Sequence, residues 1–163
     1  MEKIKSFQVD HDKLKPGLYT SRVDTFGDGF TVTTFDLRFT RPNHEAALSQ
    51  AALHTIEHLG ATFFRTKSKW KDKVIYFGPM GCKTGFYLVL AGKYKEADHY
   101  TNGPIYNLIL DFCEFIINFK GEIPGATPKE CGNYRKHNLR VAKIYTIRYL
   151  KDLIDDQNFK YPS

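Results

Sequence analysis

One stretch of the sequence, Phe35-Asp36-Leu37-Arg38-Phe39, indicates most directly how the chain folds. Apolar and charged residues alternate in it, so three apolar side chains share one face of a strand and two charged side chains share the other. This pattern is typical of an antiparallel sheet with one buried face and one polar face. We therefore expect residues 30–40 to form a strand of such a sheet.

The sequence on both sides of this strand predicts a mixed fold. Gly27-Asp28-Gly29 is a turn signal that predicts a hairpin with a strand over residues 19–25. We further expect an extended arm (6–12), helices (44–65, 105–119 and 138–154), strands (74–77 and 86–91) and a loop (124–132). The irregular order of strands and helices favours an α+β fold over a repeated βαβ unit, with the sheet packed against helices.

Length and composition limit the architecture to a single domain, residues 1–163. Hydrophobic residues make up 42% and charged residues 26% of the chain, which excludes a disordered tail, a collagen-like repeat and a coiled coil. The 24 Lys and Arg residues exceed the 18 Asp and Glu residues, which raises the question of a nucleic-acid partner.

The cysteines and the apolar segments indicate a cellular compartment. Three cysteines, Cys82, Cys113 and Cys131, are an odd number in a chain of this length, so a disulfide framework is not expected. The sequence begins without an apolar signal region, and its longest apolar run, residues 86–91, is too short to span a membrane. We expect a cytoplasmic protein with reduced thiols and no membrane partner.

The segment His54-Thr55-Ile56-Glu57-His58 is the most informative one for function. Histidines four residues apart on a helix lie on one face, so both imidazoles can reach one metal ion. A separate apolar stripe lies on roughly the opposite side of the helix and is formed by Leu48, Ala52, Ile56, Leu59 and Phe63. Because the histidines lie off the core stripe and beside a carboxylate, metal binding is favoured over two ordinary helix histidines.

Two histidines do not complete a metal site, since a catalytic divalent metal needs three protein ligands and an open position. Cys131 lies in a polar segment, and its thiolate would bind zinc or ferrous iron strongly; the alternative is a surface thiol. Cys82 lies in a polar turn between glycines, which suits a reactive side chain. Cys113 lies among apolar residues of a predicted helix and is expected to fill the core.

Several motifs coincide with one known family. They are, in chain order, Ser6-Phe7 with Asp10-His11, Phe35-Asp36-Leu37-Arg38-Phe39, His54-Thr55-Ile56-Glu57-His58-Leu59, residues 78–88 with the turn Pro79-Met80-Gly81-Cys82, and Glu130-Cys131-Gly132. With these motifs the chain resembles the LuxS family of S-ribosylhomocysteine lyases. The resemblance implies a LuxS/metallohydrolase-like fold and a homodimer with its active sites at the subunit interface.

The resemblance also implies an activity and the residues that carry it. The reaction splits S-ribosylhomocysteine into homocysteine and 4,5-dihydroxy-2,3-pentanedione, the precursor of autoinducer-2, by carbonyl migration through enediolates and β-elimination of the thiolate. His54, His58 and Cys131 would bind one divalent metal per subunit, expected to be Fe(II) in the cell and Zn(II) or Co(II) in isolated protein. Cys82 and Glu57 would be the catalytic proton carriers.

The family's substrate contacts correspond to Ser6, His11 and Arg38. Without the resemblance, Arg38 would be interpreted as a solvated partner of Asp36, and the other two as members of an ordered arm. The chain departs from the family in one place, since the strand over residues 74–78 has no acidic residue before the Pro79-Met80-Gly81-Cys82 turn. We therefore assign no substrate role to its Tyr76 or Phe77.

Two other hypotheses fit part of the sequence. In an H-x-x-E-H metallopeptidase, Glu57 would be the base for water and a downstream acid such as Glu130 the third ligand, but Cys82 would have no role. A nucleic-acid-binding domain would use the basic residues 67–73 around Trp70, where a solvated loop is the simpler interpretation. No DNA- or RNA-binding motif accompanies them, so no nucleic-acid partner is expected.

Overall fold

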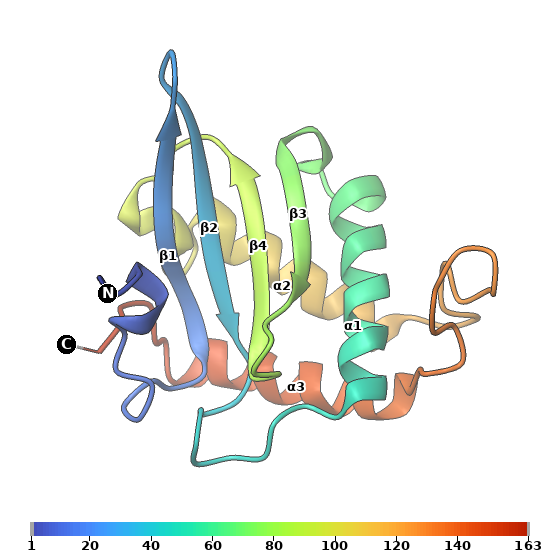
Figure 1. Ribbon diagram of the computed structural model, residues 1–163. Coiled ribbons are helices and arrows are strands. Elements are labelled where there is room, and N and C mark those ends of the chain that lie inside the picture. The colour runs from blue at the N-terminus through green and yellow to red at the C-terminus, as the bar shows by residue number, and fades with distance from the viewer. Residues whose placement is uncertain (1, 163) are drawn as a thin grey trace.

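The computed structural model describes residues 2–162, which form a four-stranded antiparallel sheet with helices packed on one of its faces (Figure 1). The strands are β1 (Gly17–Phe26), β2 (Phe30–Arg38), β3 (Val74–Pro79) and β4 (Gly85–Ala91), in the spatial order β1-β2-β4-β3. Every neighbouring pair is antiparallel. The predicted strands are thus confirmed, each within a few residues of its expected ends.

Three helices complete the fold: α1 (Gln50–Thr62), α2 (Pro104–Asn118) and α3 (Leu139–Asp155). Figure 1 shows α2 behind the sheet, α3 across its lower end and α1 beside β3. Proline at the first position starts α2, and the side chain of Asn138 caps α3 by accepting the Val141 amide at 3.0 Å. The expected α+β class is confirmed. Among the described residues no helix is both long enough and apolar enough to cross a membrane.

The β1–β2 hairpin forms at the predicted turn. Gly27 and Gly29 have φ angles of 43° and 91°, which are left-handed values that glycine adopts without steric cost. The Gly29 amide closes the turn on the Phe26 carbonyl at 3.1 Å. The turn therefore sets which residues of β1 lie opposite which residues of β2.

The alternation in β2 separates the two faces of the sheet as expected. Phe35 and Leu37 face the helices and are fully buried. On the other face, Asp36 and Arg38 form the predicted pair but are only 1% and 2% exposed. The interpretation of Arg38 as a solvated residue is therefore wrong, because other parts of the chain cover this end of the polar face.

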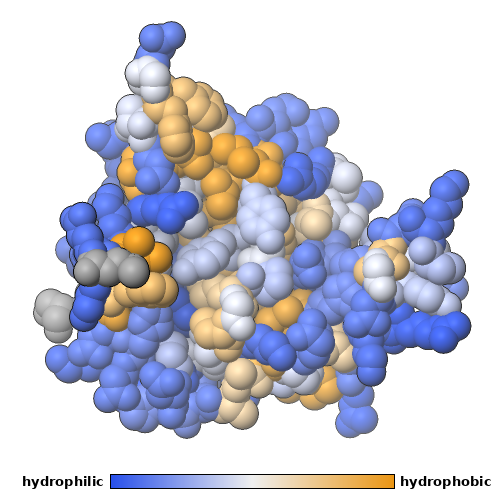
Figure 2. All heavy atoms as spheres, viewed as in Figure 1, coloured by the Kyte–Doolittle hydropathy of each residue, from blue (hydrophilic) through white to orange (hydrophobic). Residues whose placement is uncertain are grey.

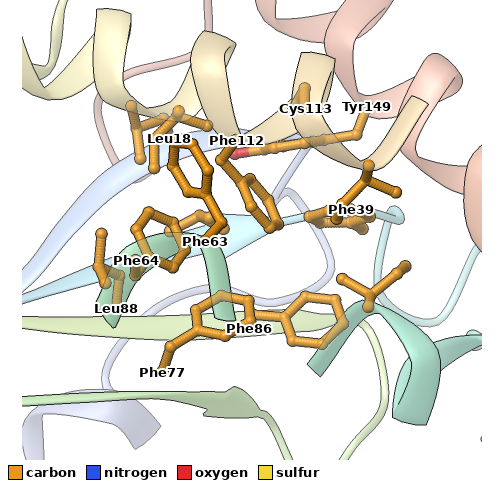
Figure 3. Close-up of a cluster of buried hydrophobic side chains, with 14 of the residues drawn as sticks. Leu18, Phe39, Phe63, Phe64, Phe77, Phe86, Leu88, Phe112, Cys113 and Tyr149 are labelled. Atoms are coloured by element: carbon orange, nitrogen blue, oxygen red, sulfur yellow. The ribbon is translucent and has the colours of Figure 1, made fainter. Parts of the chain in front are cut away.

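An aromatic layer fills the space between the sheet and the helices (Figure 3). Phe77 stacks on Phe86 with ring centroids 5.3 Å apart, and Phe64 stacks on Phe112 at 5.0 Å. Cys113 is fully buried beside this layer, and burial raises the pKa of its thiol. Its prediction as a core filler is confirmed.

The first predicted helix is wrong at its start. Helix α1 begins at Gln50 rather than near residue 44, and a π-helical turn over Phe63–Lys67 follows it. Asn43 has a φ angle of 63°, and the Leu48 amide bonds the Lys83 carbonyl at 2.8 Å. The segment before α1 is therefore attached to the β3–β4 turn and cannot extend the helix.

The N-terminal arm is also not the extended segment that was expected. It contains a 3-10 turn at Lys5–Phe7 and a second turn in which the Asp10 carboxylate accepts the amides of Asp12 and Lys13. Aspartate commonly stabilises such turns by bonding backbone amides ahead of it. The arm is therefore folded back locally rather than paired as a strand.

Candidate active site

His54 and His58 lie one turn apart on α1, as their spacing predicts, and both rings are held by the backbone. Nδ1 of His54 is 2.8 Å from the Lys136 carbonyl oxygen, and Nδ1 of His58 is 2.7 Å from the Pro124 carbonyl oxygen. Because a carbonyl only accepts, each Nδ1 carries the hydrogen and each Nε2 presents a lone pair. This tautomer and this orientation are those of metal-binding histidines held by a backbone carbonyl.

Cys131 completes a group of three ligands. Its Sγ lies 3.4 Å from Nε2 of His54, and one ligand atom from each of His54, His58 and Cys131 falls within 4.8 Å of the others. Tetrahedral bonds of about 2.0–2.3 Å place neighbouring ligand atoms about 3.5 Å apart, so this trio fits one metal ion. Three protein donors leave the fourth position free for a substrate atom.

His137 supports the metal centre and was missed by the sequence interpretation. Its ring stacks on that of His54 with centroids 4.1 Å apart and meets the His58 ring edge-on at 4.8 Å. Its Nδ1 lies 3.2 Å from the Thr55 hydroxyl. Burial and the two neighbouring histidines lower the pKa of His137 to about 4, so the ring is neutral and packs without repelling a cation.

Glu57 lies beside the metal centre, on the side where the surface is hollowed. Glu57 and His58 line a cavity of about 280 Å³ together with Pro124 and Gly125 of the following loop. Gly125 has a φ angle of 71° and lets the loop approach the His58 ring closely. Glu57 therefore borders a cavity that the candidate ligand His58 also lines, and it does not belong to the ligand trio.

Cys82 lies in the β3–β4 turn with an exposed side chain, as expected for a reactive thiol. Its Sγ is 3.1 Å from the Thr84 hydroxyl and 3.9 Å from Nη1 of Arg38. The same Nη1 donates to the Thr84 hydroxyl at 2.6 Å, so the hydroxyl hydrogen is free to point at the sulfur. The sulfur therefore has a cation and a hydroxyl donor close to it.

Arg38 is fixed by a buried pair with Asp36. Nη2 donates to Oδ2 of Asp36 at 2.6 Å and Nε donates to Oδ1 at 3.2 Å, a two-point contact that fixes the plane of the guanidinium. Tyr161, close to the end of the chain, donates its hydroxyl to Oδ2 of Asp36 at 2.8 Å. Burial raises the pKa of Asp36, and the charge and hydrogen bonds of Arg38 oppose that rise.

Ser6 and His11 approach this region from the arm. Ser6 lines a cavity of about 210 Å³ on the outer face of the sheet, together with Tyr76 and Tyr87. His11 is close enough for its charge to lower the pKa of Asp36. The structure thus brings both predicted substrate residues to the face that carries Arg38. It also places Tyr76, which received no predicted role, in the lining of the cavity.

The site residues form two clusters, one around Cys82 and one around the metal ligands. Among residues 2–162, no hydrogen bond or ion pair joins the two clusters. Glu130, the alternative third ligand, is exposed and bonded to the Thr127 hydroxyl, and it lies outside the ligand trio. The metallopeptidase hypothesis therefore loses its third ligand.

The fold and the two clusters together define an α+β protein with a three-ligand group suited to a metal ion and an exposed cysteine beside a buried arginine. Residues 4–160 match the family model described as S-Ribosylhomocysteinase (LuxS). The chain belongs to the LuxS family.

Curated relatives support this assignment over the whole chain. A protein of Finegoldia magna named S-ribosylhomocysteine lyase is 51% identical over 99% of this chain and 99% of its own length. A relative of the same name from Borreliella afzelii is 49% identical, over 99% of this chain and all of its own. Another from Clostridium beijerinckii is 48% identical over the full length of both chains.

Proposed function

We propose that this protein is a metal-dependent lyase that cleaves S-ribosylhomocysteine into homocysteine and 4,5-dihydroxy-2,3-pentanedione. The observation that carries the proposal is the convergence of His54, His58 and Cys131 on one ion-sized site in a member of the LuxS family. Relatives that bear the lyase name match the chain from end to end. The product would serve as the precursor of the autoinducer-2 signal in quorum sensing, and the reaction would recycle homocysteine to the methyl cycle.

The ligand trio suits one divalent metal per subunit. Imidazole and thiolate donors bind Fe(II), Zn(II) and Co(II), and availability decides among them, so we propose Fe(II) in the cell and Zn(II) or Co(II) in isolated protein. A metal ion held by His54, His58 and Cys131 would supply Lewis-acid polarisation of substrate oxygens. The backbone carbonyls of Lys136 and Pro124 accept the Nδ1 hydrogens and keep both imidazoles oriented toward a bound metal.

Cys82 is the proposed acid/base for the carbon-bound protons. Moving a carbonyl along the ribose chain through enediolates requires a base to take a proton from one carbon and return it to the next. Arg38 and Thr84 lie against the sulfur, so a cation and a hydroxyl group are in place beside the reacting atom. The exposed position of Cys82 leaves it open to a substrate.

Glu57 is the proposed second proton carrier. It precedes the candidate ligand His58 on α1 and borders a cavity together with it. From that position it can move protons between substrate oxygens and assist the β-elimination that expels the homocysteine thiolate. Ser6, His11 and Arg38 are the proposed substrate-binding residues, since all three lie at the outer face of the sheet.

We infer that the active enzyme is a cytoplasmic homodimer with its sites at the interface. Figure 2 shows apolar residues gathered on the open face of the sheet, around the β1–β2 hairpin and the strands below it. Phe26 and Phe30 lie opposite each other at the hairpin end and are 57% and 58% exposed, and Val32 and Val89 lie on the same face of the sheet. A second copy on this face would bury them. The free thiols fit a reducing compartment.

The activity is tested by incubating anaerobically purified, metal-loaded protein with S-ribosylhomocysteine and measuring free thiol and the dicarbonyl product together. We expect both products in equal amounts and no cleavage of a peptide library. Cleavage of peptides without thiol release would replace the lyase with the metallopeptidase. Absence of both activities in protein with one metal per chain would contradict the proposal.

A further inference from the structure

We propose that Tyr161 is a positioning residue for the reactive thiol: through Asp36 and Arg38 it holds the guanidinium against Cys82. The effect on catalysis rests on the proposed lyase function, whereas the effect on the thiol does not. Tyr161 lies 79 positions beyond Cys82 in the sequence, close to the end of the chain.

A continuous chain of hydrogen bonds carries the inference. The Tyr161 hydroxyl donates to Oδ2 of Asp36 at 2.8 Å, and the same oxygen accepts Nη2 of Arg38 at 2.6 Å. At its other nitrogen, Arg38 bonds Thr84 at 2.6 Å and lies 3.9 Å from the Cys82 sulfur. Every group between the tyrosine and the thiol is buried, where hydrogen bonds in series strengthen one another.

The tail that carries Tyr161 is held firmly against β1. The Tyr161 ring stacks on that of Tyr19 with centroids 4.9 Å apart and planes 17° from parallel. Asn158 accepts the Leu18 amide at 3.1 Å through its carbonyl and donates its side-chain amide to the Pro16 carbonyl at 3.0 Å. These contacts hold residues 158–161 in place without the Tyr161 hydroxyl, so the hydroxyl can serve to position Asp36.

The hydroxyl has a specific effect on the carboxylate. Oδ2 of Asp36 takes hydrogen bonds from both Arg38 and Tyr161, and Oδ1 takes one from Arg38. Without the tyrosine donor, Oδ2 keeps only its hydrogen bond from Arg38 in a buried site. The carboxylate can then recover hydrogen bonding by turning toward Arg38 or toward water that enters the site. Either change alters the two-point contact that fixes the plane of the guanidinium, and we expect Nη1 to move from its position against Thr84 and Cys82. Burial and the charge of Asp36 raise the pKa of Tyr161, so it remains a donor.

The test is Tyr161→Phe, which removes the hydroxyl and keeps the ring on Tyr19. Metal-loaded protein is alkylated with iodoacetamide over a range of pH, and modification is measured by mass spectrometry on the Cys82 peptide. We expect the midpoint of the alkylation profile to move upward by about half a pH unit, because the lost bond acts on the sulfur through two intermediaries. Under the lyase assay, kcat should fall about threefold to tenfold with KM little changed.

Other charged groups near the sulfur stay the same in this variant. The charges of Arg38 and Asp36 are retained, Tyr87 lies close enough for the thiol to affect its pKa, and Lys83 is adjacent in sequence. His11 faces Asp36 from the arm. The matched control is Tyr100→Phe, which removes a tyrosine hydroxyl bonded to Glu96 at the surface next to the same tail. The control should leave the alkylation midpoint unchanged.

A double-mutant cycle separates positioning from simple support of the fold. Asp36→Asn should shift the midpoint in the same direction, and adding Tyr161→Phe to it should produce no further shift. An unchanged midpoint in soluble, folded Tyr161→Phe protein, or additive shifts in the double variant, would overturn the proposal. If the wild-type protein releases no thiol from S-ribosylhomocysteine, the lyase function fails, but the alkylation profiles still decide the role of Tyr161.

Discussion

The Sγ atom of Cys131 lies 3.4 Å from Nε2 of His54, although 77 residues separate the two along the chain. The contact exists because the loop between α2 and α3 folds back on α1, where its carbonyls also accept the Nδ1 hydrogens of both histidines. One loop therefore supplies a ligand and orients the two others. Metal binding should depend on this loop as strongly as on the helix.

Replacing Cys131 with alanine should remove the metal. Two imidazoles remain in place, but the loss of the thiolate should weaken metal affinity by more than about 100-fold, since losing a group that only hydrogen-bonds a ligand already costs about 10–100-fold. Metal content after dialysis against a chelator measures the effect by elemental analysis. Retention of one metal per chain, held as tightly as in the wild type, would show that another residue is the third ligand.

Replacing Cys82 with alanine should separate catalysis from metal binding. Metal content and the unfolding midpoint should match the wild type, because the side chain is exposed and lies outside the ligand trio. Thiol release from S-ribosylhomocysteine should fall by about 10²–10⁴-fold, the contribution typical of a positioned acid/base. Substantial remaining activity in metal-loaded protein would exclude Cys82 as the proton carrier.

Introducing a charge on the outer face of the sheet should weaken the proposed dimer. Val89→Asp places a carboxylate opposite Thr34 on the outer face of the sheet, where burial against a second copy would require desolvating it. Light scattering should show a shift from dimer to monomer with parallel loss of lyase activity. The control Ile147→Asp alters an exposed apolar residue on α3 and should stay dimeric. A dimeric Val89→Asp protein would place the interface elsewhere.

Stability should fall in mild acid because of His99. This ring is buried, with Nε2 3.0 Å from the Phe159 carbonyl oxygen, and burial lowers its pKa from the ordinary 6.5. Below about pH 6.5 the unfolded chain therefore binds a proton that the folded chain resists, so the free energy of unfolding declines as pH falls. Urea unfolding of His99→Gln should show a smaller loss between about pH 7.5 and pH 5.5. Identical losses in both proteins would remove His99 as a cause.

Gly60 should resist substitution because it sets the distance between α1 and β3. A Cβ at this position would meet the ring of Phe77, which is itself stacked on Phe86 in the core. Gly60→Ala should lower the free energy of unfolding by about 1–3 kcal/mol despite the better helix propensity of alanine. Gly81→Ala, where a Cβ meets open space, is the matched control for urea unfolding. Equal stability of both variants would contradict a close packing of α1 on β3.

The site was partly predictable because part of it is local. The spacing of His54 and His58 fixes their common face on a helix, and the glycine-flanked turn exposes Cys82. Thr84 belongs to the same turn and its position two residues after the cysteine was a usable signal, although no role was predicted for it. The start of α1 was not predictable. The Leu48 amide donates to the carbonyl of Lys83, which is distant in sequence, and not to a carbonyl of the preceding helical turn.

The sequence by itself determined the alternation of β2 and the histidine pair, because each depends on residues within a few positions of one another. It also determined the family, because the family's motifs can be read directly from the sequence. Only the tertiary structure decided which distant groups meet. It placed Cys131 and His137 on the histidines, buried Asp36 with Arg38, and brought Tyr161 onto that pair. Backbone geometry dictates which residues share a helix or strand face, whereas contacts across the fold depend on how all the elements pack and on which polar groups must find partners once buried.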